Sequence, residues 1–218
     1  MSVWAILVAA GSGDRLGADR PKAFVRLGER VLLAEPLERL ESSEWVDAIV
    51  VVAPPEWEEP AILLAEELGA GKVNAVVTGG ATRAESVRIA LAEVPDDAAV
   101  VLVHDAARPL LPESVIERVL AKLNEGFDGA VPGLPVVDTV KRVERDAVVE
   151  TLARDGLVTV QTPQAFVAPV LKAAAVGEGT DCASLVEAGG GRIGVVEGDP
   201  RLLKVTTPED LKLVSSWL

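Results

Sequence analysis

The sequence predicts an α/β fold with a mainly parallel central sheet, and two features of the chain carry this prediction. Short apolar runs recur along the 218 residues, and segments with helical periodicity lie between them. The runs are apolar throughout rather than alternating, which is typical of strands that helices cover on both faces. The expected architecture is a Rossmann-like three-layer sandwich. Its 49% hydrophobic content and its length suit a single domain over residues 1–218.

Six apolar runs supply the expected strands. They are VWAILVA (3–9), AIVVVA (48–53), VNAVVT (73–78), AVVLVH (99–104), GAVPG (129–133) and RIGVVE (192–197). The longest apolar run, residues 3–10, is far shorter than the roughly 20 residues that cross a bilayer. A buried strand is therefore expected there, and no membrane is expected as a partner.

Two of the intervening helices are placed by the residues at their starts. Thr82 and Glu85 have the spacing of a capping box, and apolar residues repeat at helical intervals behind them. Thr207 is placed to cap a closing helix over roughly 208–217, whose first turn holds Asp210.

One stretch, residues 135–164, has no clear helical period. It is rich in valine and threonine and has turn signals at ERDA and RDG. We expect a β-hairpin arm, approximately residues 136–153, that extends from the main sheet. Because isolated hairpins are marginal in water, the arm is expected to pack against something, such as a second copy of the chain.

The composition narrows the classes of function. A formal net charge of −13 argues against a nucleic-acid or anionic-membrane partner, which long-range repulsion would disfavour. The single cysteine, Cys182, and the single histidine, His104, exclude cysteine clusters and multi-histidine metal sites. His104 is expected to be packed or hydrogen-bonded rather than a catalytic base. One cysteine and no secretion signal favour the cytoplasm.

The glycine-rich loop AAGSGDRLG (9–17) directly follows the first expected strand. Its glycines would let amide groups approach an anion closely, although a plain tight turn also fits. Its glycine spacing departs from the dinucleotide fingerprint, and the loop lacks the Gly-Lys-Ser/Thr of a P-loop. Arg15 and Lys22 favour a polyphosphate ligand, whereas Arg20 is expected to be a surface charge.

Three further places fall where strands lead into helices. Gly79 and Gly80 could admit a base or ribose, or could form a simple turn. Asp105 suggests a hydroxyl or metal contact, with a turn cap as the alternative, and Arg108 suggests an anion contact. A lone lysine such as Lys204 is ordinarily a surface residue, and it becomes a candidate site residue only together with the other residues named here.

Taken together, these loops resemble the 2-C-methyl-D-erythritol 4-phosphate cytidylyltransferases of the non-mevalonate isoprenoid pathway. The motifs run nearly end to end: AAGSGDRLG with PKAF, GGATRAESV, VHDAARP, PVVDTVKR, LARDGL, TPQAF, TDCASL and VEGDPRLLKVTTPEDL. The opening loop is shared by sugar-phosphate nucleotidyltransferases generally, whereas HDAARP, DTVK and KVTTPEDL are far more specific. The resemblance implies transfer of CMP from CTP to a sugar-alcohol phosphate, with release of pyrophosphate.

The resemblance also implies a requirement for Mg²⁺. The cation would be held largely by the CTP phosphates, so no residue of the chain is assigned as a metal ligand. A phosphate nucleophile is mostly dianionic at neutral pH, and so needs no general base. This agrees with the lack of a histidine, cysteine or paired-carboxylate catalytic group.

Individual positions receive roles from the resemblance. Arg15 and Lys22 are implied to stabilise the pentavalent α-phosphate. The other implied assignments are Ala10, Gly11, Ser12, Gly13, Gly79, Gly80 and Ser86 for CTP, Asp105 and Arg108 for the sugar-phosphate side, and Thr139, Arg154 and Lys204 for the substrate phosphate. In the family, the two arm residues of this set, Thr139 and Arg154, reach the neighbouring subunit's site, so a homodimer is implied.

Three positions depart from the commoner family pattern: Ala81 replaces an aspartate, Cys182 an acidic residue and Val158 a tryptophan. None of these changes removes a cation or a backbone amide. The alternatives are ribitol-5-phosphate cytidylyltransferase, similar in fold and in most loops, and a guanylyltransferase serving a molybdenum cofactor, against which the arm and C-terminal motifs argue. A third, a nucleotide-binding module without turnover, is disfavoured by Arg15 and Lys22.

Overall fold

The computed structural model describes residues 2–175 and 181–218, so Thr180, which opens the motif TDCASL, lies outside the described residues. Four strands form a parallel block in the order β6, β1, β4, β5. Their bounds are β1 (Val3–Val8), β4 (Ala48–Ala53), β5 (Val73–Thr78) and β6 (Val100–Asp105). These are the first four predicted strands, within one residue at each end, which confirms the prediction from continuous apolar runs.

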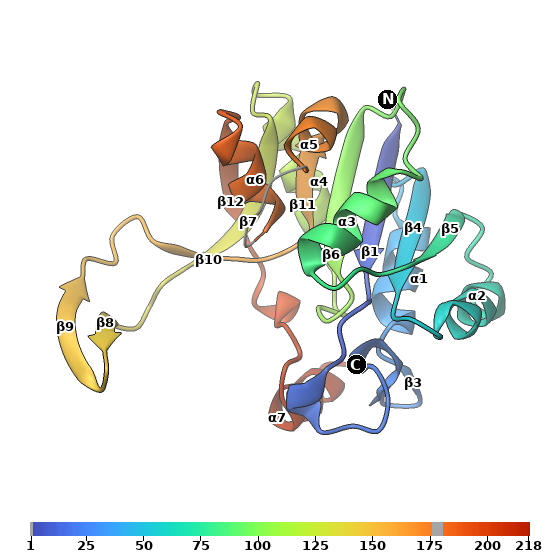
Figure 1. Cartoon of the computed structure of the whole chain (residues 1–218), viewed down its shortest axis with the longest axis horizontal. Coiled ribbons are helices and arrows are strands. Elements are labelled where there is room, and N and C mark those ends of the chain that lie inside the picture. Colours follow the sequence, from blue (N-terminus) through green and yellow to red (C-terminus); the bar gives the residue numbers. More distant parts are fainter. Residues whose placement is uncertain (1, 176–180) are drawn as a thin grey trace.

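The other half of the sheet is mixed in direction (Figure 1). Its strands are β7 (Gly129–Pro135), β10 (Val158–Val160), β11 (Gln164–Val167) and β12 (Ile193–Glu197). β12 runs parallel to β7, whereas β11 is antiparallel to both β6 and β7, and β10 is antiparallel to β7. The pattern of apolar runs did not predict β10 and β11, but the sheet as a whole is mostly parallel, as expected.

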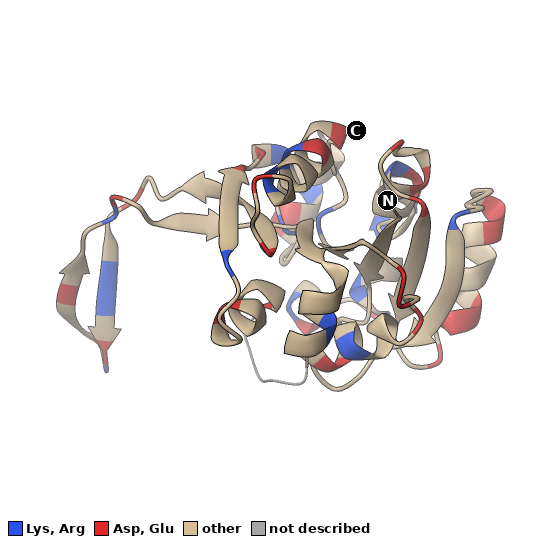
Figure 2. Cartoon of the chain, turned by 90° about the horizontal axis from the view of Figure 1, so that it is seen from above, with Lys and Arg blue, Asp and Glu red and all other residues tan. Residues whose placement is uncertain are grey.

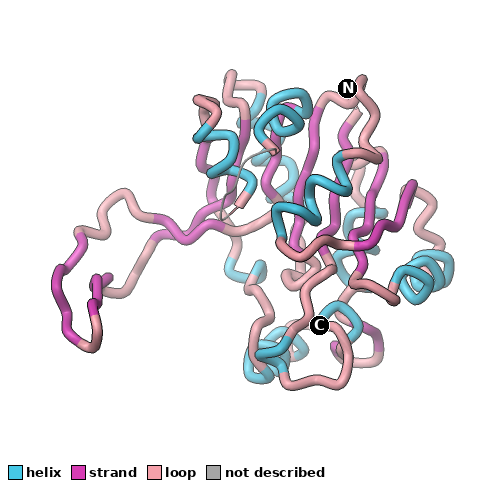
Figure 3. The backbone as a smooth tube through the Cα atoms, in the orientation of Figure 1, coloured by secondary structure: helices cyan, strands magenta, loops and turns pink. Residues whose placement is uncertain are grey.

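Helices cover both faces of the sheet and complete the three layers (Figure 3). Alternate side chains of β1 point to opposite cores: Ala5 and Leu7 into one, Ile6 into the other. The first core is closed by α1 (Ala34–Ser42), α2 (Glu58–Glu67) and α4 (Glu113–Leu123). The second is closed by α3 (Arg83–Leu91), α5 (Ala168–Ala174) and α6 (Cys182–Ala188).

A smaller apolar cluster lies beneath the opening loop. It joins Leu16, Leu27 and Leu32 to Val205 and to Val214 of α7 (Pro208–Ser215). Leu27 belongs to a short antiparallel pair, β2 (Arg26–Leu27) and β3 (Arg30–Val31). The cluster therefore packs the segment from Leu16 to Leu32 against the end of the chain, although the two are remote in sequence.

The predicted helix starts are partly correct. Thr207 and Asp210 form the full reciprocal capping box of α7, but the helix ends at Ser215 instead of 217. Thr82 accepts from the amide of Glu85 as expected, but the prediction of a capping box there is wrong. The Glu85 carboxylate instead accepts from the amide of Ala81, one residue further back, at 2.8 Å.

The predicted hairpin arm is present. Strands β8 (Val140–Glu144) and β9 (Ala147–Leu152) pair antiparallel through a two-residue turn, Arg145 and Asp146, both with positive φ. In two views the hairpin lies well away from the main sheet (Figures 1 and 2). Its cross-strand valines, Val143 and Val148, are 57% and 60% exposed. The arm is thus an apolar surface that the described part of this chain leaves uncovered.

Within the described residues, no helix has both the length and the apolar character that a membrane crossing requires.

Candidate functional site

A cavity of about 430 Å³ opens at the carboxyl edge of the parallel block, a volume suited to a small molecule. β1 leads on to β4 on one side and pairs with β6 on the other, so the cavity lies at the point where strand order reverses. Its walls are the loops after β1, β5 and β6 and the segment before α7, with the lining residues Val8, Ala9, Ala10, Gly11, Ser12, Arg15, Lys22, Ala23, Gly80, Ala81, Thr82, Arg83, Ser86, Asp105, Ala106, Ala107 and Lys204.

The opening loop and the turn that follows it place Arg15 and Lys22 in the lining of this cavity. Lys22 begins a 3-10 turn (Lys22–Phe24), and its ammonium group donates to the carbonyl of Val205 at 3.1 Å. Gly13 packs directly on Lys22, since a Cβ at Gly13 would lie 2.7 Å from the Lys22 Cβ, and the φ of Gly13 is +79°. The structure therefore gives Gly13 a packing role, and Gly13 is not among the cavity-lining residues.

The surroundings of Lys22 destabilise the charged form of its side chain. Burial lowers the pKa of its ammonium group, and the nearby cations Lys204 and Arg15 lower it further. A polyanion in the cavity would relieve both effects, because it would replace lost solvation and offset the repulsion between the cations.

The loop between β5 and α3 forms a second wall. Gly79 lies against the opening loop, because a Cβ there would meet the Ala10 Cβ at 2.2 Å. The Ser86 hydroxyl accepts from the amide of Gly80 at 3.1 Å and donates to the carbonyl of Thr82 at 2.9 Å. Gly80 and Ser86 line the cavity, whereas Gly79 sets the distance between the two loops.

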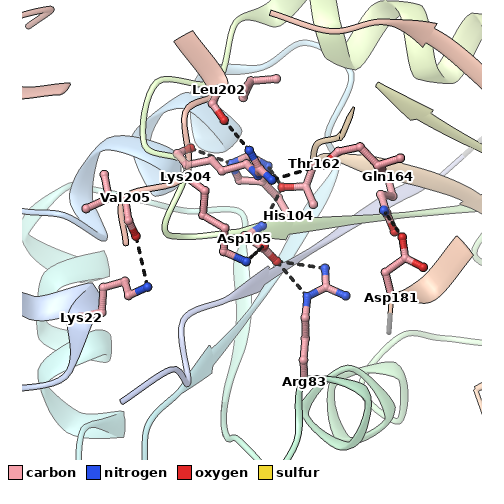
Figure 4. Close-up of polar contacts among 12 residues, drawn as sticks. Lys22, Arg83, His104, Asp105, Thr162, Gln164, Asp181, Leu202, Lys204 and Val205 are labelled. Atoms are coloured by element: carbon pink, nitrogen blue, oxygen red, sulfur yellow. Dashed lines mark hydrogen bonds and ion pairs between the residues drawn. The ribbon is translucent and has the colours of Figure 1, made fainter. Parts of the chain in front are cut away.

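Asp105, at the end of β6, lies between two cations (Figure 4). Its Oδ1 accepts from Arg83 at 2.9 Å, and its Oδ2 accepts from the Lys204 ammonium at 2.7 Å. Burial alone would raise the pKa of this carboxyl, but Arg83 and Lys204 outweigh burial and hold the pKa well below its usual range. Asp105 is therefore a paired carboxylate rather than a proton acceptor.

His104 is fully buried beside Asp105 and has two hydrogen-bond partners. Its Nε2 lies 3.0 Å from the carbonyl of Arg108, which can only accept, so Nε2 carries the proton. Its Nδ1 then accepts from the Thr162 hydroxyl at 3.1 Å, and the same hydroxyl accepts from the amide of Asp105 at 3.0 Å. Burial lowers the pKa of His104 to about 4, which keeps the ring neutral at pH 7. The expectation that His104 is a packed, hydrogen-bonded residue is confirmed.

Besides Gly13 and Gly79, three expected site residues are not among the residues that line this cavity in the described structure. Arg108 donates to the carbonyl of Leu202 at 2.6 Å and is not a lining residue. Thr139 precedes β8, and Arg154 follows β9 and donates to the carbonyl of Val137, so both belong to the arm. Arg108 therefore holds the segment before Lys204, and the two arm residues lie outside the lining of the cavity in their own chain.

Arg83 was not assigned a role from the sequence, yet it lines the cavity and pairs with Asp105. Part of the sequence pattern could have indicated Arg83, because it is the first residue of the helix that follows a predicted strand. In the structure this helix, α3, begins at the carboxyl edge and packs across β1 and β4. A second unassigned contact is that of Cys182, whose buried Sγ lies 3.7 Å from Arg83 Nη1. The departure from an acidic residue at Cys182 thus falls beside the site.

The cavity is basic in a strongly acidic chain. Its charged lining residues are four cations, Arg15, Lys22, Arg83 and Lys204, against one carboxylate, Asp105. Both oxygens of that carboxylate are taken, and His104 is neutral and buried. Such a cavity suits a polyanionic ligand and a reaction that needs positioned positive charge rather than proton abstraction.

The family of the chain is indicated by a comparison with family models. The model described as 2-C-methyl-D-erythritol 4-phosphate cytidylyltransferase matches residues 3–218. Curated proteins of the same name are similar along nearly the whole chain. The one from Nocardia farcinica is 46% identical over 220 residues, covering 100% of this chain and 94% of its own length. The one from Rhodococcus jostii is 47% identical over 215 residues, covering 97% and 92%.

Solved structures agree with the sequence comparison. A crystal structure titled 4-diphosphocytidyl-2C-methyl-D-erythritol synthase superposes with a TM-score of 0.85 at 35% identity, covering 99% of this chain and 97% of that one. The 2-C-methyl-D-erythritol 4-phosphate cytidylyltransferase from Thermus thermophilus superposes with a TM-score of 0.79 at 33% identity, covering 97% and 96%. The three-layer fold with its mostly parallel sheet is therefore that of these enzymes.

Proposed function

The chain belongs to the 2-C-methyl-D-erythritol 4-phosphate cytidylyltransferase family, and on that basis we propose that its cavity transfers CMP from CTP to 2-C-methyl-D-erythritol 4-phosphate. The observation that carries this proposal is the meeting of four cations with the glycine loop at the strand ends. The relatives described above carry the methylerythritol name, which favours that acceptor over ribitol 5-phosphate.

The proposed reaction needs positioned charge and no base. An oxygen of the acceptor's phosphate forms a bond to the α-phosphorus of CTP, the bond from that phosphorus to the β-phosphate oxygen breaks, and pyrophosphate leaves with the electron pair. The acceptor phosphate is mostly dianionic at neutral pH, since its second pKa is about 6. The activation barrier arises from the approach of two polyanions. Arg15 and Lys22 lower this barrier by stabilising the charge that gathers at the α-phosphorus.

The nucleotide side of the cavity is formed by the two glycine loops. The backbone of Ala10, Gly11 and Ser12 lines the cavity, which suits close approach of the triphosphate. Gly80 and Ser86 line the part proposed to take the cytosine and ribose. Ala81 stands at the cavity wall with only a methyl group, so recognition of the base at this point rests on main-chain groups.

A divalent cation, Mg²⁺, fits this site only as a companion of the nucleotide. Of the lining residues, Asp105 alone offers a carboxylate, and no cluster of three or more acidic, histidine or cysteine side chains suited to a metal occurs in the described part of the chain. Mg²⁺ is commonly held by one or two protein carboxylates together with substrate phosphates and water. When bound it would neutralise phosphate charge; Lys22 and Arg15 act on the α-phosphate from the protein side.

The acceptor side is proposed to combine groups from two copies of the chain. Lys204 lines the cavity and would hold the acceptor's phosphate. Thr139 and Arg154 flank the arm strands β8 and β9, which lie away from the main sheet (Figure 1), and neither lines the cavity of its own chain. They would complete the phosphate site in a partner copy. The exposed valines of the arm support a homodimer, because apolar surface of this kind is stabilised by burial.

The test is release of pyrophosphate by the purified chain with CTP, Mg²⁺ and each acceptor in turn. We expect rapid release with 2-C-methyl-D-erythritol 4-phosphate, slow release with ribitol 5-phosphate, and slower turnover when GTP, ATP or UTP replaces CTP. Preference for ribitol 5-phosphate would overturn the proposed acceptor, and preference for GTP would overturn the proposed donor.

A further inference from the structure

Arg83 contacts two residues beside the cavity, Asp105 and Cys182, but it has no role in the reaction proposed above. Its Nε donates to Oδ1 of Asp105 at 2.9 Å, and its Nη2 forms an ion pair with the same oxygen at 2.9 Å. Its Nη1 lies 3.7 Å from the buried Sγ of Cys182. The side chain is three-quarters buried. Its guanidinium is therefore fixed on both sides by groups of the protein and is not a mobile surface charge.

Asp105 is immobilised from its main chain as well as from its carboxylate. Its amide donates to the Thr162 hydroxyl, and each carboxylate oxygen accepts from a different cation. Oδ1 accepts from Arg83, and Oδ2 accepts from the Lys204 ammonium at 2.7 Å. The contact of Arg83 with Oδ1 orients the carboxylate. The orientation of the carboxylate in turn determines where Oδ2 holds the Lys204 ammonium.

Lys204 needs such support because it lies on a segment between helices. It is the second residue after the 3-10 turn Pro200–Leu202 and comes before the start of α7. A lysine side chain has four rotatable bonds, so an unsupported ammonium would sample many positions. Asp105 removes that freedom through a contact between residues 99 positions apart in sequence.

We propose that Arg83 is a positioning residue for the acceptor: through Asp105 it fixes the Lys204 ammonium at the place where the acceptor's phosphate binds (Figure 4). This inference rests on the proposed function and adds to it an acceptor-side role for a residue on the nucleotide-side helix α3. Arg83 need not touch either substrate. Arg83 acts only through the carboxylate of Asp105, so its replacement should change the binding of the acceptor and leave the binding of CTP nearly unchanged.

The test measures KM for each substrate separately in Arg83→Gln. Loss of a charge-assisted contact predicts a rise of about tenfold or more in the acceptor KM, while the CTP KM stays within about threefold. The matched control is Arg88→Gln. Arg88 lies on the same helix but is 56% exposed and meets Glu85 at 3.7 Å, so neither KM should change.

A pH profile separates this role from a merely structural one. The charged and titratable groups that face Asp105 are Arg83, Lys204, His104, Arg108, Lys22 and Cys182. Removal of Arg83 takes away a cation that favours the ionised carboxylate, so the pKa of Asp105 rises in the variant. The ratio of acceptor kcat/KM between Arg83→Gln and the parent chain should therefore fall as the pH is lowered, and titration of the acceptor itself cancels in that ratio.

The outcomes are distinct. An active parent chain whose acceptor KM and pH ratio are unchanged by Arg83→Gln overturns the inference, as does a larger change in the CTP KM than in the acceptor KM. If Arg83→Gln does not fold, Arg83→Lys takes its place. Lysine keeps the positive charge but carries it on a single nitrogen, so the acceptor KM should rise by a smaller factor, and an unchanged acceptor KM would again contradict the inference. A parent chain that does not use this acceptor at all overturns the proposed function and the inference with it.

Discussion

At the residue scale, Lys22 is the side chain on which the proposed chemistry depends most. Its ammonium is half-buried, is anchored by a single carbonyl acceptor at 3.1 Å, and has its pKa lowered by burial and by two neighbouring cations. A cation in this state gains most when negative charge appears next to it. That is the condition at the α-phosphate during transfer.

Lys22→Ala should therefore lower kcat by about 10² or more, because one preorganised charge is lost where charge develops. Folding should survive, since the ammonium group makes one hydrogen bond to the protein. The measurement is steady-state kinetics beside a thermal melt, with Lys212→Ala, an exposed lysine of α7, as the control. An unchanged kcat in Lys22→Ala would remove Lys22 from the proposed mechanism.

His104 leads to a prediction about stability rather than rate. Its pKa is about 4 in the folded chain and ordinarily about 6.5, so the folded state disfavours the charged ring. A depressed folded pKa gives stability that is fully present above the unfolded pKa and is lost as the pH falls toward the folded pKa. Between about pH 6 and 5, His104 should thus contribute a slope approaching ~1.4 kcal/mol per pH unit to the free energy of unfolding.

Urea unfolding at a series of pH values measures that slope. In His104→Gln the contribution should vanish, because the amide does not titrate, although the variant will be less stable overall. Equal slopes in the parent chain and the variant between pH 6 and 5 would show that His104 is not held neutral by the fold.

Single residues also show where sequence reasoning reaches its limit. Glycines and cations near the strand ends indicated the cavity, and Arg15, Lys22, Asp105 and Lys204 do line it. Arg108 is expected to contact an anion; what the structure adds is that its guanidinium donates to the carbonyl of Leu202, close to it in space and 94 positions away in sequence. Partners so distant in sequence are set by the fold, and no local pattern encodes them.

At the scale of elements, the glycine loops divide into two kinds. Gly79 allows two loops to touch, since a Cβ there would meet the Ala10 Cβ at 2.2 Å. Gly11 has no atom within 4 Å of the place a Cβ would take, yet it lines the cavity. The first glycine serves packing, whereas the second borders open space in the cavity.

This division predicts opposite phenotypes. Gly79→Ala should lower the free energy of unfolding by about 1–3 kcal/mol through overpacking, whereas Gly11→Ala should leave stability nearly unchanged and raise the KM for CTP. Gly71→Ala, with ordinary contact at 3.8 Å, is the neutral control. Denaturation and CTP kinetics on the three variants decide the matter; a normal KM for CTP in Gly11→Ala would argue against triphosphate binding at that loop.

The elements themselves were predictable to different degrees. The run of β4 was placed to the residue because burial on both faces leaves few alternatives. β5 was also placed to the residue, although it is an edge strand whose side chains are only partly buried or exposed. β10 and β11 were missed because they have only three and four residues, and their pairing depends on β7 and β6. The arm was foreseen because its valines and turn residues have a pattern of their own, independent of the sheet.

At the scale of the whole molecule, the proposed site is complete only when two copies meet. The arm lies away from the main sheet (Figure 2), and Thr139 and Arg154 flank its strands β8 and β9. These strands pair as an antiparallel ladder, with an ion pair between Arg142 and Glu150 at 3.3 Å. Replacing residues 136–153 with a short glycine-serine loop should yield monomers with little activity. Analytical ultracentrifugation with kinetics tests this, and an active monomer would contradict the shared site.

A mixed-dimer experiment tests the shared site without removing the arm. Lys22→Ala damages a chain's own cavity, and Arg154→Ala damages the partner's cavity. Either variant alone should be nearly inactive, but co-expressed in equal amounts they should regain about a quarter of the parent activity, since half of the dimers are mixed and each of those has one intact site. No recovery on mixing would place Arg154 outside the partner's site.

The most direct test of the central claim follows the phosphorus atom itself. The chain is given CTP labelled at its α-phosphorus, Mg²⁺ and 2-C-methyl-D-erythritol 4-phosphate, and the products are separated. The account predicts that the label passes to the acceptor as a cytidine diphosphate ester, in step with pyrophosphate release, and that Lys22→Ala slows this transfer by about 10² or more. Label that stays in CTP, or that appears as free CMP whether or not the acceptor is present, would contradict it.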